Sequence, residues 1–212
     1  MNNNKIELDS AKPDWTGNYN SIFKTLGASN HTDKEREVND YYATDPIAID
    51  VLINDGKSEI NHNVWECACG EGHLAKRLSN YGYNVTATDL IDRGFGTGGV
   101  NFLETNTIFN GDIVTNPPYK YAVKFIEHAL DIIPTGNKVF MFLKLQFLEG
   151  KSRKELFKKY PPKCIYVSSS RILCAKNGDF EGMKKSGGSA VAYAWYEWEK
   201  GYTGDTIIKW VN

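Results

Sequence analysis

Residues 64–75 read VWECACGEGHLA, in which a β-prone start is followed by a turn of small residues and then by the beginning of a helix. This order is typical of a unit that binds a ligand at the carboxyl edge of a parallel sheet, because glycines let the ligand approach the backbone closely. The spacing Gly70-x-Gly72-x-x-Ala75, with Asp89 further along, also fits a dinucleotide fingerprint. The turn therefore indicates a nucleotide-like ligand and leaves its identity open.

An acidic residue, Glu66, stands at the end of this strand, where dinucleotide-binding folds usually carry an apolar side chain. A carboxylate beside the turn suits a cationic group, such as the ammonium of S-adenosylmethionine, better than it suits a pyrophosphate. We therefore favour S-adenosylmethionine over a nicotinamide cofactor. Cys67 and Cys69 are one residue apart and lack further ligands nearby in the sequence, so we expect small buried fillers and no metal site.

Outward from this turn, short β-prone runs alternate with longer amphipathic ones, which predicts an α/β protein with a parallel sheet and crossover helices. The clearest helix is 121–133, where apolar residues recur with helical spacing. Asp45 followed by Pro46 predicts another helix start, and Gly56 its end. The expected strands are residues 64–67, 84–89, 111–115, 138–143, 164–168 and 190–198.

The composition is that of a folded globular protein. The chain has 212 residues, 41% hydrophobic and 24% charged, which excludes collagen-like and wholly disordered classes. We expect a polar tail and arm over residues 1–40 and one domain over residues 41–212. No apolar run reaches the roughly 18 residues of a membrane span, and the first residues lack a signal-peptide core. These features predict a cytoplasmic protein with no membrane partner.

The strongest chemical signal is the stretch Asn116-Pro117-Pro118-Tyr119, which follows a β-prone run and precedes the helix 121–133. Two successive prolines fix the backbone and remove two amide donors, so the corner is rigid and rich in acceptors. The Asn116 side-chain oxygen and the Pro117 carbonyl can both accept hydrogen bonds from one planar NH2 group, which frees its lone pair to attack an electrophilic methyl. Tyr119 offers an aromatic face for a base. We predict these four as the catalytic residues.

The chain, with this Asn-Pro-Pro-Tyr motif, resembles the amino-group methyltransferases of DNA, specifically the N6-adenine enzymes that carry the same motif. It is most similar to the small versions frequent in bacteriophages and prophages, and the resemblance spans about residues 22–212. Besides residues 116–119, it rests on NDYYATDP (residues 39–46), WECACGEG (65–72), KLQFLEG (144–150) and AVAYAWYEW (190–198).

The resemblance implies a Rossmann-like class I S-adenosylmethionine-dependent methyltransferase with a seven-stranded, mostly parallel sheet and an antiparallel last strand, for which residues 190–198 fit. It also implies a cofactor site in which residues 42–44 close over the methionine end and an acid binds the ribose. One departure is Asn101, where relatives often carry Asp. The implied cofactor-binding residues are Tyr42, Ala43, Thr44, Glu66, Ala68, Gly70, Asp89, Leu90, Phe102 and Asn116.

The charge is unevenly distributed, although the net charge is only -1. Residues 137–185 carry 12 basic and 4 acidic side chains, which is the footprint of a polyanion partner or a solvated helix face. Only 69 residues follow Leu143, too few for a full target-recognition domain. We therefore expect a basic helix, residues 152–160, and a loop to hold duplex or single-stranded DNA with modest sequence discrimination. The predicted DNA-binding residues of the loop are Arg171, Lys176, Lys184 and Lys185.

Two other functions stay open at this point. An Asn-Pro-Pro-Tyr corner can hold any planar NH2 group, so methylation of RNA adenine or of a protein glutamine amide is an alternative. A binding module that senses S-adenosylmethionine or DNA without catalysis is another, although an intact corner argues against it. The oligomeric state and the target sequence do not follow from the residues.

Overall fold

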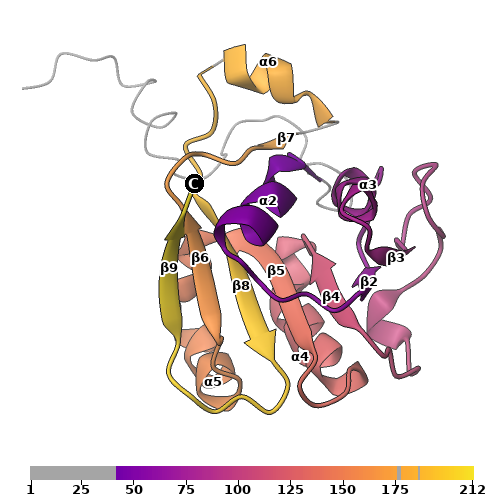
Figure 1. The fold of residues 1–212 in the computed structure, drawn as a ribbon, viewed down its shortest axis with the longest axis vertical. Helices are drawn as coiled ribbons and strands as arrows, with labels where there is room; N and C mark the ends of the chain where they lie inside the picture. The colour runs from indigo at the N-terminus through magenta and orange to yellow at the C-terminus, as the bar shows by residue number, and fades with distance from the viewer. Residues whose placement is uncertain (1–41, 176–177, 186) are drawn as a thin grey trace, which may run out of the picture. The chain divides into compact units, whose positions relative to one another are not determined.

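The main feature of the computed structural model, which describes residues 42–175, 178–185 and 187–212, is a seven-stranded sheet. Its strands are β2 (Asn63–Glu66), β3 (Asn84–Ala87), β4 (Asp112–Thr115), β5 (Lys138–Lys144), β6 (Cys164–Ser168), β8 (Tyr193–Glu199) and β9 (Ile207–Val211). Their spatial order is β3-β2-β4-β5-β8-β6-β9 (Figure 1). Within this sheet β8 is antiparallel to both of its neighbours, and all other pairs are parallel.

This sheet confirms the α/β class predicted from the sequence. Each of the six expected strands is present, with ends that differ by up to three residues. The antiparallel strand expected over residues 190–198 is β8, but it is not the last one, because β9 follows and runs parallel to β6. The sequence analysis misses β9. Four of its five residues are exposed, so the run IIKWV lacks the alternation that marks a half-buried strand.

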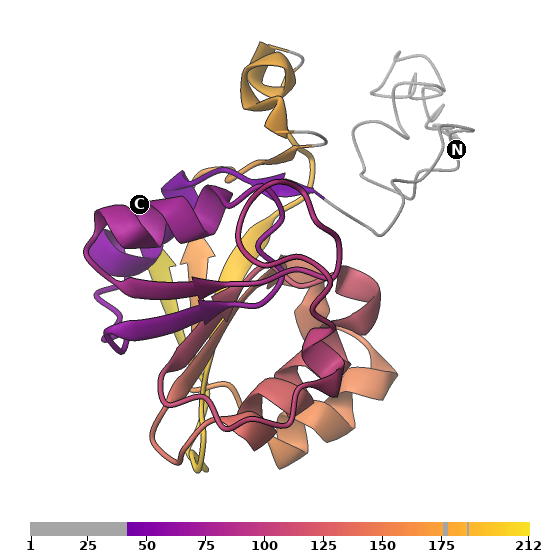
Figure 2. The same ribbon diagram turned by 90° about the vertical axis from the view of Figure 1, so that its right-hand side faces the viewer.

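Helices cover both faces of the sheet (Figure 2). On one face lie α2 (Ile47–Asp50), its π-helical continuation η2 (Val51–Asp55) and α3 (His73–Asn80); on the other lie α4 (Ala122–Ile132) and α5 (Lys151–Lys159). Strand β5 contributes to the hydrophobic cores on both faces of the sheet. Phe140 and Phe142 pack in the core on the side of α2 and α3, and Met141 packs in the core on the side of α4 and α5. None of the helices in the described part of the chain combines the length and apolar character needed to cross a membrane.

The predicted helix starts and stops agree closely with the structure. Helix α4 lies within one residue of the expected 121–133 at either end. At the start of α2, Asp45 accepts a hydrogen bond from the Ile47 amide at 3.1 Å, and the π-helical turn ends at Gly56. A Cβ on Gly56 would lie 2.9 Å from the Tyr166 ring, so a larger residue would separate this turn from the sheet.

A second, two-stranded sheet lies at the end of the molecule where the parallel strands finish (Figure 1). It pairs β1 (Ala43–Thr44) with β7 (Cys174–Ala175) in antiparallel fashion, with Thr44 opposite Cys174. The short helix α6 (Phe180–Lys185) follows β7 at the same end. This small sheet brings residues from opposite ends of the chain over the carboxyl edge of the main sheet. The expected tail and arm, residues 1–40, lies outside the described residues.

Candidate active site

A cavity of about 630 Å³ opens at the carboxyl ends of β2 and β4, beneath β1. It is formed by residues from both expected halves of the site, the glycine-rich turn and the proline corner. The sequence-predicted residues that line it are Tyr42, Ala43, Thr44, Glu66, Ala68, Asp89, Leu90, Phe102, Asn116, Pro117, Pro118 and Tyr119. Gly70 is the single predicted cofactor-binding residue that does not line it. The roles proposed for these lining residues in cofactor binding and catalysis remain predictions.

The glycine turn after β2 depends on backbone conformations that other residues rarely adopt. Gly70 and Gly72 have φ values of 54° and 82°, and a Cβ on Gly72 would lie 2.3 Å from the Phe95 ring. The buried Gly70 amide donates to Asp89 Oδ2 at 2.8 Å, and Asp89 Oδ1 accepts from the Ile91 amide at 2.9 Å. Asp89 therefore ties the turn to the loop after β3, and Gly70 acts through its backbone.

A buried carboxyl group, that of Glu66, forms part of the cavity wall. Its residue is only 1% exposed, and its Oε1 accepts a hydrogen bond from the Thr115 hydroxyl. Burial raises the pKa of Glu66 to about 8, although hydrogen bonds from Thr115 and the Ala68 amide oppose this shift. The neighbouring Asp89 carboxylate adds to the rise. Glu66 is therefore mostly uncharged at neutral pH, and a cation in the cavity would favour its ionised form.

The proline corner presents a polar side chain whose two ends differ. Asn116 Nδ2 donates to Thr44 Oγ1 at 2.8 Å and to Cys174 Sγ at 3.9 Å. In contrast, Asn116 Oδ1 is buried and has no hydrogen-bond partner in the described part of the chain. An unpaired buried acceptor costs roughly 1–3 kcal/mol, which a donor from a bound molecule would recover. The corner therefore offers an acceptor to a ligand with N–H groups.

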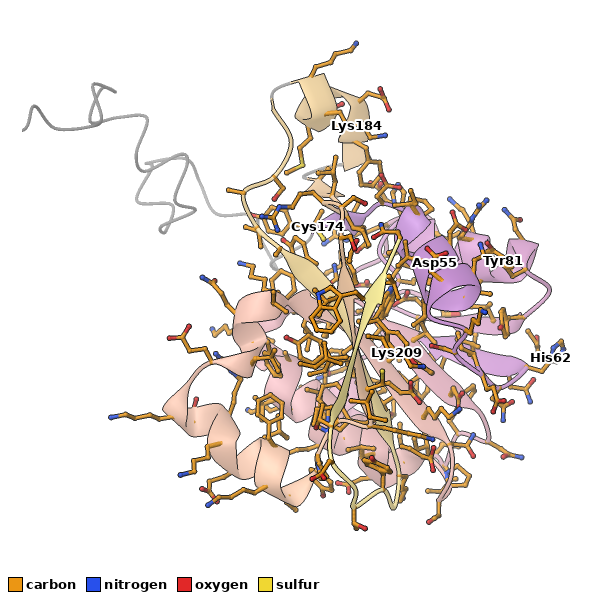
Figure 3. The ribbon with its side chains drawn as sticks, turned by 60° about the vertical axis from the view of Figure 1, so that its left-hand side comes forward. Asp55, His62, Tyr81, Cys174, Lys184 and Lys209 are labelled. Atoms are coloured by element: carbon orange, nitrogen blue, oxygen red, sulfur yellow. The ribbon has the colours of Figure 1, made fainter. Side chains whose placement is uncertain are left out.

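Cys174 holds several of these groups together, and the sequence analysis does not identify it. Its Sγ accepts from Tyr119 Oη at 3.7 Å and lies 4.0 Å from Thr44 Oγ1, in addition to the contact with Asn116. Burial raises the pKa of Cys174 to about 11, so the group stays a thiol. Nothing in the sequence around Cys174 marks it, because its role comes from the pairing of β1 with β7. Figure 3 shows Cys174 at the level of this small sheet.

The aromatic residue of the corner, Tyr119, is surrounded by residues from the other matched segments. Its ring stacks on Tyr193, with centroids 6.1 Å apart, and Lys144 Nζ lies 5.0 Å from its centroid. Lys144 and Tyr193 belong to the stretches 144–150 and 190–198, and the resemblance gave neither residue a role in the site. The structure thus brings three distant segments together around one ring.

Two predicted adenine contacts occupy very different environments. Leu90 is an exposed residue at the rim of the cavity, free to contact a ligand. Phe102 is 2% exposed and packs against Trp65 with ring centroids 5.3 Å apart and against Phe125 with centroids 5.0 Å apart. Phe102 is therefore chiefly a core residue that backs the cavity wall.

The predicted DNA-binding residues lie apart from the cavity lining. Lys184 and Lys185 are exposed in the last turn of α6, where Lys184 Nζ contacts Glu181 Oε1 at 3.2 Å. Figure 3 shows Lys184 farther out than Cys174 at the same end of the molecule. Arg171 is exposed between β6 and β7, and Lys176 lies outside the described residues. The basic helix α5, which was expected to hold DNA together with this loop, ends just before β6 begins, so its last lysines lie at the opposite, amino edge of the sheet from α6.

Other lining residues were not anticipated. His73 begins α3 and contacts Phe180 of α6 edge-to-face, with centroids 5.5 Å apart, which links the glycine turn to α6. Burial lowers the pKa of His73. Lys120 and Tyr121, directly after the proline corner, stand exposed at the cavity rim. Among the described residues, no group of three or more His, Cys, Asp or Glu side chains could hold a metal ion.

The sequence matches no protein-family model and no curated protein at a significant level. The fold is similar to that of a Listeria monocytogenes protein assigned to the class I S-adenosylmethionine-dependent methyltransferases, with a TM-score of 0.55 and 14% identity over 84% of this chain and 68% of that one. A proposed hemolysin from Lactococcus lactis has a TM-score of 0.56 and 11% identity, over 77% of this chain and 91% of the hemolysin chain. A modification subunit of a proposed type I restriction enzyme from Vibrio vulnificus has a TM-score of 0.53 and 11% identity, over 82% of this chain and 48% of the subunit.

These similarities concern the fold. The chain has the class I methyltransferase fold, a seven-stranded, mostly parallel sheet with one antiparallel strand. S-adenosylmethionine is the cofactor expected for this fold. The cavity suits it, because a buried carboxyl of raised pKa, Glu66, and a second carboxylate, Asp89, line it together with apolar side chains such as Leu90.

The raised pKa of Glu66 predicts a pH-dependent stability. Between the ordinary pKa of 4.5 and about 8, the folded protein keeps a proton that the unfolded chain releases. The free energy of unfolding therefore falls as pH rises through this window, by up to about 1.4 kcal/mol per pH unit from this group. We expect Glu66→Gln to equal the wild type near pH 5 and to be more stable above pH 8, measured by thermal melting.

A matched control is Glu59→Gln, which removes an exposed carboxyl. It should shift the melting curve little at any pH. A Glu66→Gln variant whose stability follows the wild type at every pH would contradict the raised pKa.

Proposed function

We propose that the protein is an S-adenosylmethionine-dependent methyltransferase that acts on the N6 amino group of adenine in DNA. The proposal rests mainly on one observation, the buried Oδ1 of Asn116, which has no hydrogen-bond partner among the described residues and lies in the cavity that also contains Glu66. An exocyclic amino group has the N–H donors that this acceptor lacks. The same cavity supplies a carboxyl suited to a cationic cofactor end.

The chain's own residues would prepare the amino group for reaction. Asn116 Oδ1 and the Pro117 carbonyl would accept its two hydrogens, which draws the nitrogen toward tetrahedral geometry and frees its lone pair. Thr44 and Cys174 would keep the Asn116 amide in the required orientation, since they take its Nδ2 hydrogens. Tyr119 would contact the base. The methylated amine is acidic and releases a proton without a strong general base.

Bound S-adenosylmethionine would supply an electrophilic methyl group. Glu66 would accept hydrogen bonds from its ammonium end, and ionise as it does so. Asp89 would accept from the ribose hydroxyls, because each of its oxygens can take a hydrogen bond beyond the backbone amide that it already holds. Leu90 would lie beside the adenine at the open rim, with Phe102 supporting the wall.

Two features favour DNA as the substrate. Lys184 and Lys185 lie at the same end of the molecule as β7 and the cavity, where a nucleic-acid backbone would approach. The Vibrio vulnificus protein with this fold is a proposed restriction-modification subunit. The amino group of adenine is paired in a duplex, so the base would be flipped out or presented by a single strand.

The first test is a methyl-transfer assay with the purified chain, labelled S-adenosylmethionine and four separate substrates: duplex DNA, single-stranded DNA, RNA and bulk protein. We expect label in N6-methyladenine of DNA. Asn116→Ala should lower kcat by about 100-fold or more, because the lost acceptor acts on the amino group in the reaction. Asn116→Asp, which keeps an acceptor oxygen, is the matched variant and should retain more activity.

Label in RNA or protein, or in another DNA base, would contradict the assignment to DNA adenine. Cofactor binding without transfer to any of the four substrates would favour the non-catalytic binding module.

The role of Cys174 is tested by a pair of substitutions. Cys174→Val keeps a small apolar side chain but removes the acceptor for Asn116 and Tyr119, so we expect kcat to fall about fivefold to tenfold with the KM for S-adenosylmethionine unchanged. Cys174→Ser keeps a hydrogen-bonding group and should lie closer to the wild type. Steady-state kinetics on DNA measure both. A valine variant with full kcat would show that Cys174 is only a filler.

The α6 lysines are tested through the salt dependence of DNA binding. Lys184→Ala with Lys185→Ala should weaken binding at low salt and reduce the slope of log K against log salt by up to about two, measured by fluorescence anisotropy. Lys158→Ala with Lys159→Ala is a closely matched control, because α5 also ends in two lysines, the first paired with a glutamate three residues earlier. Equal effects of the two double substitutions would exclude a specific role for α6.

A further inference from the structure

The outermost strand of the sheet, β9, carries an unusual amount of exposed apolar surface. Ile207 is 54% exposed, Ile208 is 47% exposed and Trp210 is 73% exposed. In the described part of the chain, β9 has one neighbour, β6, and its other edge pairs with no strand (Figure 1). Isolated exposed apolar residues are ordinary, but three of five residues on an open strand edge mark an interaction surface or an aggregation hazard.

The free edge also presents backbone groups that can form hydrogen bonds. The Ile207 amide donates to the Lys163 carbonyl at 3.1 Å, which orients the backbone groups of Ile207 toward β6. Because these groups alternate along a strand, those of Ile208 and Trp210 point away from β6. The surface therefore offers a template for another strand as well as apolar side chains.

Apolar side chains occur on both faces of this strand. Ile207 is in register with Cys164, which belongs to the core layer under α2. Ile208 is in register with Ile165, which belongs to the layer under α4 and α5, and Trp210 shares the face of Ile208. A flat partner could cover only one of these faces. The partner that fits continues the sheet and brings its own layers on both sides.

We propose that this partner is a second copy of the chain, joined by antiparallel pairing of the two β9 strands about a two-fold axis. A two-fold contact uses the same patch on both copies and closes on itself, and antiparallel pairing of two identical strands has this symmetry. Charge selects the register. Pairing centred on Lys209 would oppose two lysines, while pairing centred on Ile208 sets Lys209 opposite Ile207 of the second copy and lets the outward backbone groups of the two Ile208 residues bond to each other.

This arrangement has a consequence for the cavities. Antiparallel pairing reverses the strand direction from one copy to the other, so the two carboxyl edges face opposite ways. The cavities would lie on opposite edges of the continuous sheet, and neither copy would complete the site of the other. The inference is therefore independent of the proposed function. Figure 1 shows β9 at the opposite side of the sheet from β3 and α3.

The test is the mass of the full-length chain by sedimentation at concentrations from about 1 to about 100 µM. We expect the wild type to reach twice its 23.9 kDa mass. Two substitutions should return it to a monomer. Ile208→Pro removes an outward amide without removing a bond to β6, a position at which edge strands tolerate proline. Trp210→Lys replaces the most exposed apolar side chain with a charge. Far-UV circular dichroism confirms that both variants are folded.

The matched control is Ile108→Lys, which adds the same charge at another apolar residue, 62% exposed and away from β9. This variant should remain a dimer. A wild-type monomer at the highest concentration would overturn the proposal, whether the edge stays open or another part of the chain covers it. A dimer that survives both β9 substitutions would also overturn it, and a mass above that of a dimer would exclude the two-fold arrangement.

Discussion

The hydrogen bond between the Thr115 hydroxyl and the Glu66 carboxyl joins the two halves of the candidate site. Glu66 ends β2 and Thr115 ends β4, and these strands are neighbours although they are far apart in the chain. Their parallel pairing brings the glycine turn and the proline corner, which directly follow, to the same edge of the sheet. If β2 and β4 were not adjacent, Asn116 and Glu66 would not share a cavity.

The small sheet of β1 and β7 provides the second constraint. Thr44 and Cys174 are opposite each other in this sheet, and together they take the amide hydrogens of Asn116. The proline corner alone makes the backbone rigid, but it does not decide how the asparagine side chain is rotated. The rotation of the Asn116 side chain is set by Thr44, which precedes β2, and by Cys174, which follows β6. The short helix α6 follows β7 in the chain, and Phe180 of α6 contacts His73 of the cavity wall, so this helix connects the cavity to the exposed lysines.

The site contains unfavourable features that a ligand would relieve. A buried carboxyl such as that of Glu66 is held uncharged by its surroundings, and the Asn116 side-chain oxygen accepts no hydrogen bond from the residues that the structure describes. The large cores on either side of the sheet supply the stability that tolerates these local costs. A cationic group and an amino group would each remove one of them, and the two features together therefore support the proposed transfer from a cationic donor to an amine. The exposed β9 edge, by contrast, stands apart from this chemistry.

The sequence by itself determined the α/β class, most strand and helix positions and the two chemical segments, because alternation, helical spacing and proline or glycine turns are local properties of the chain. It did not reveal β9, whose residues are exposed on both faces and so carry no periodic signal. It also did not reveal the contacts of Cys174 or the raised pKa of Glu66. Those depend on which distant segments exclude water and supply partners, and only the tertiary structure decides that.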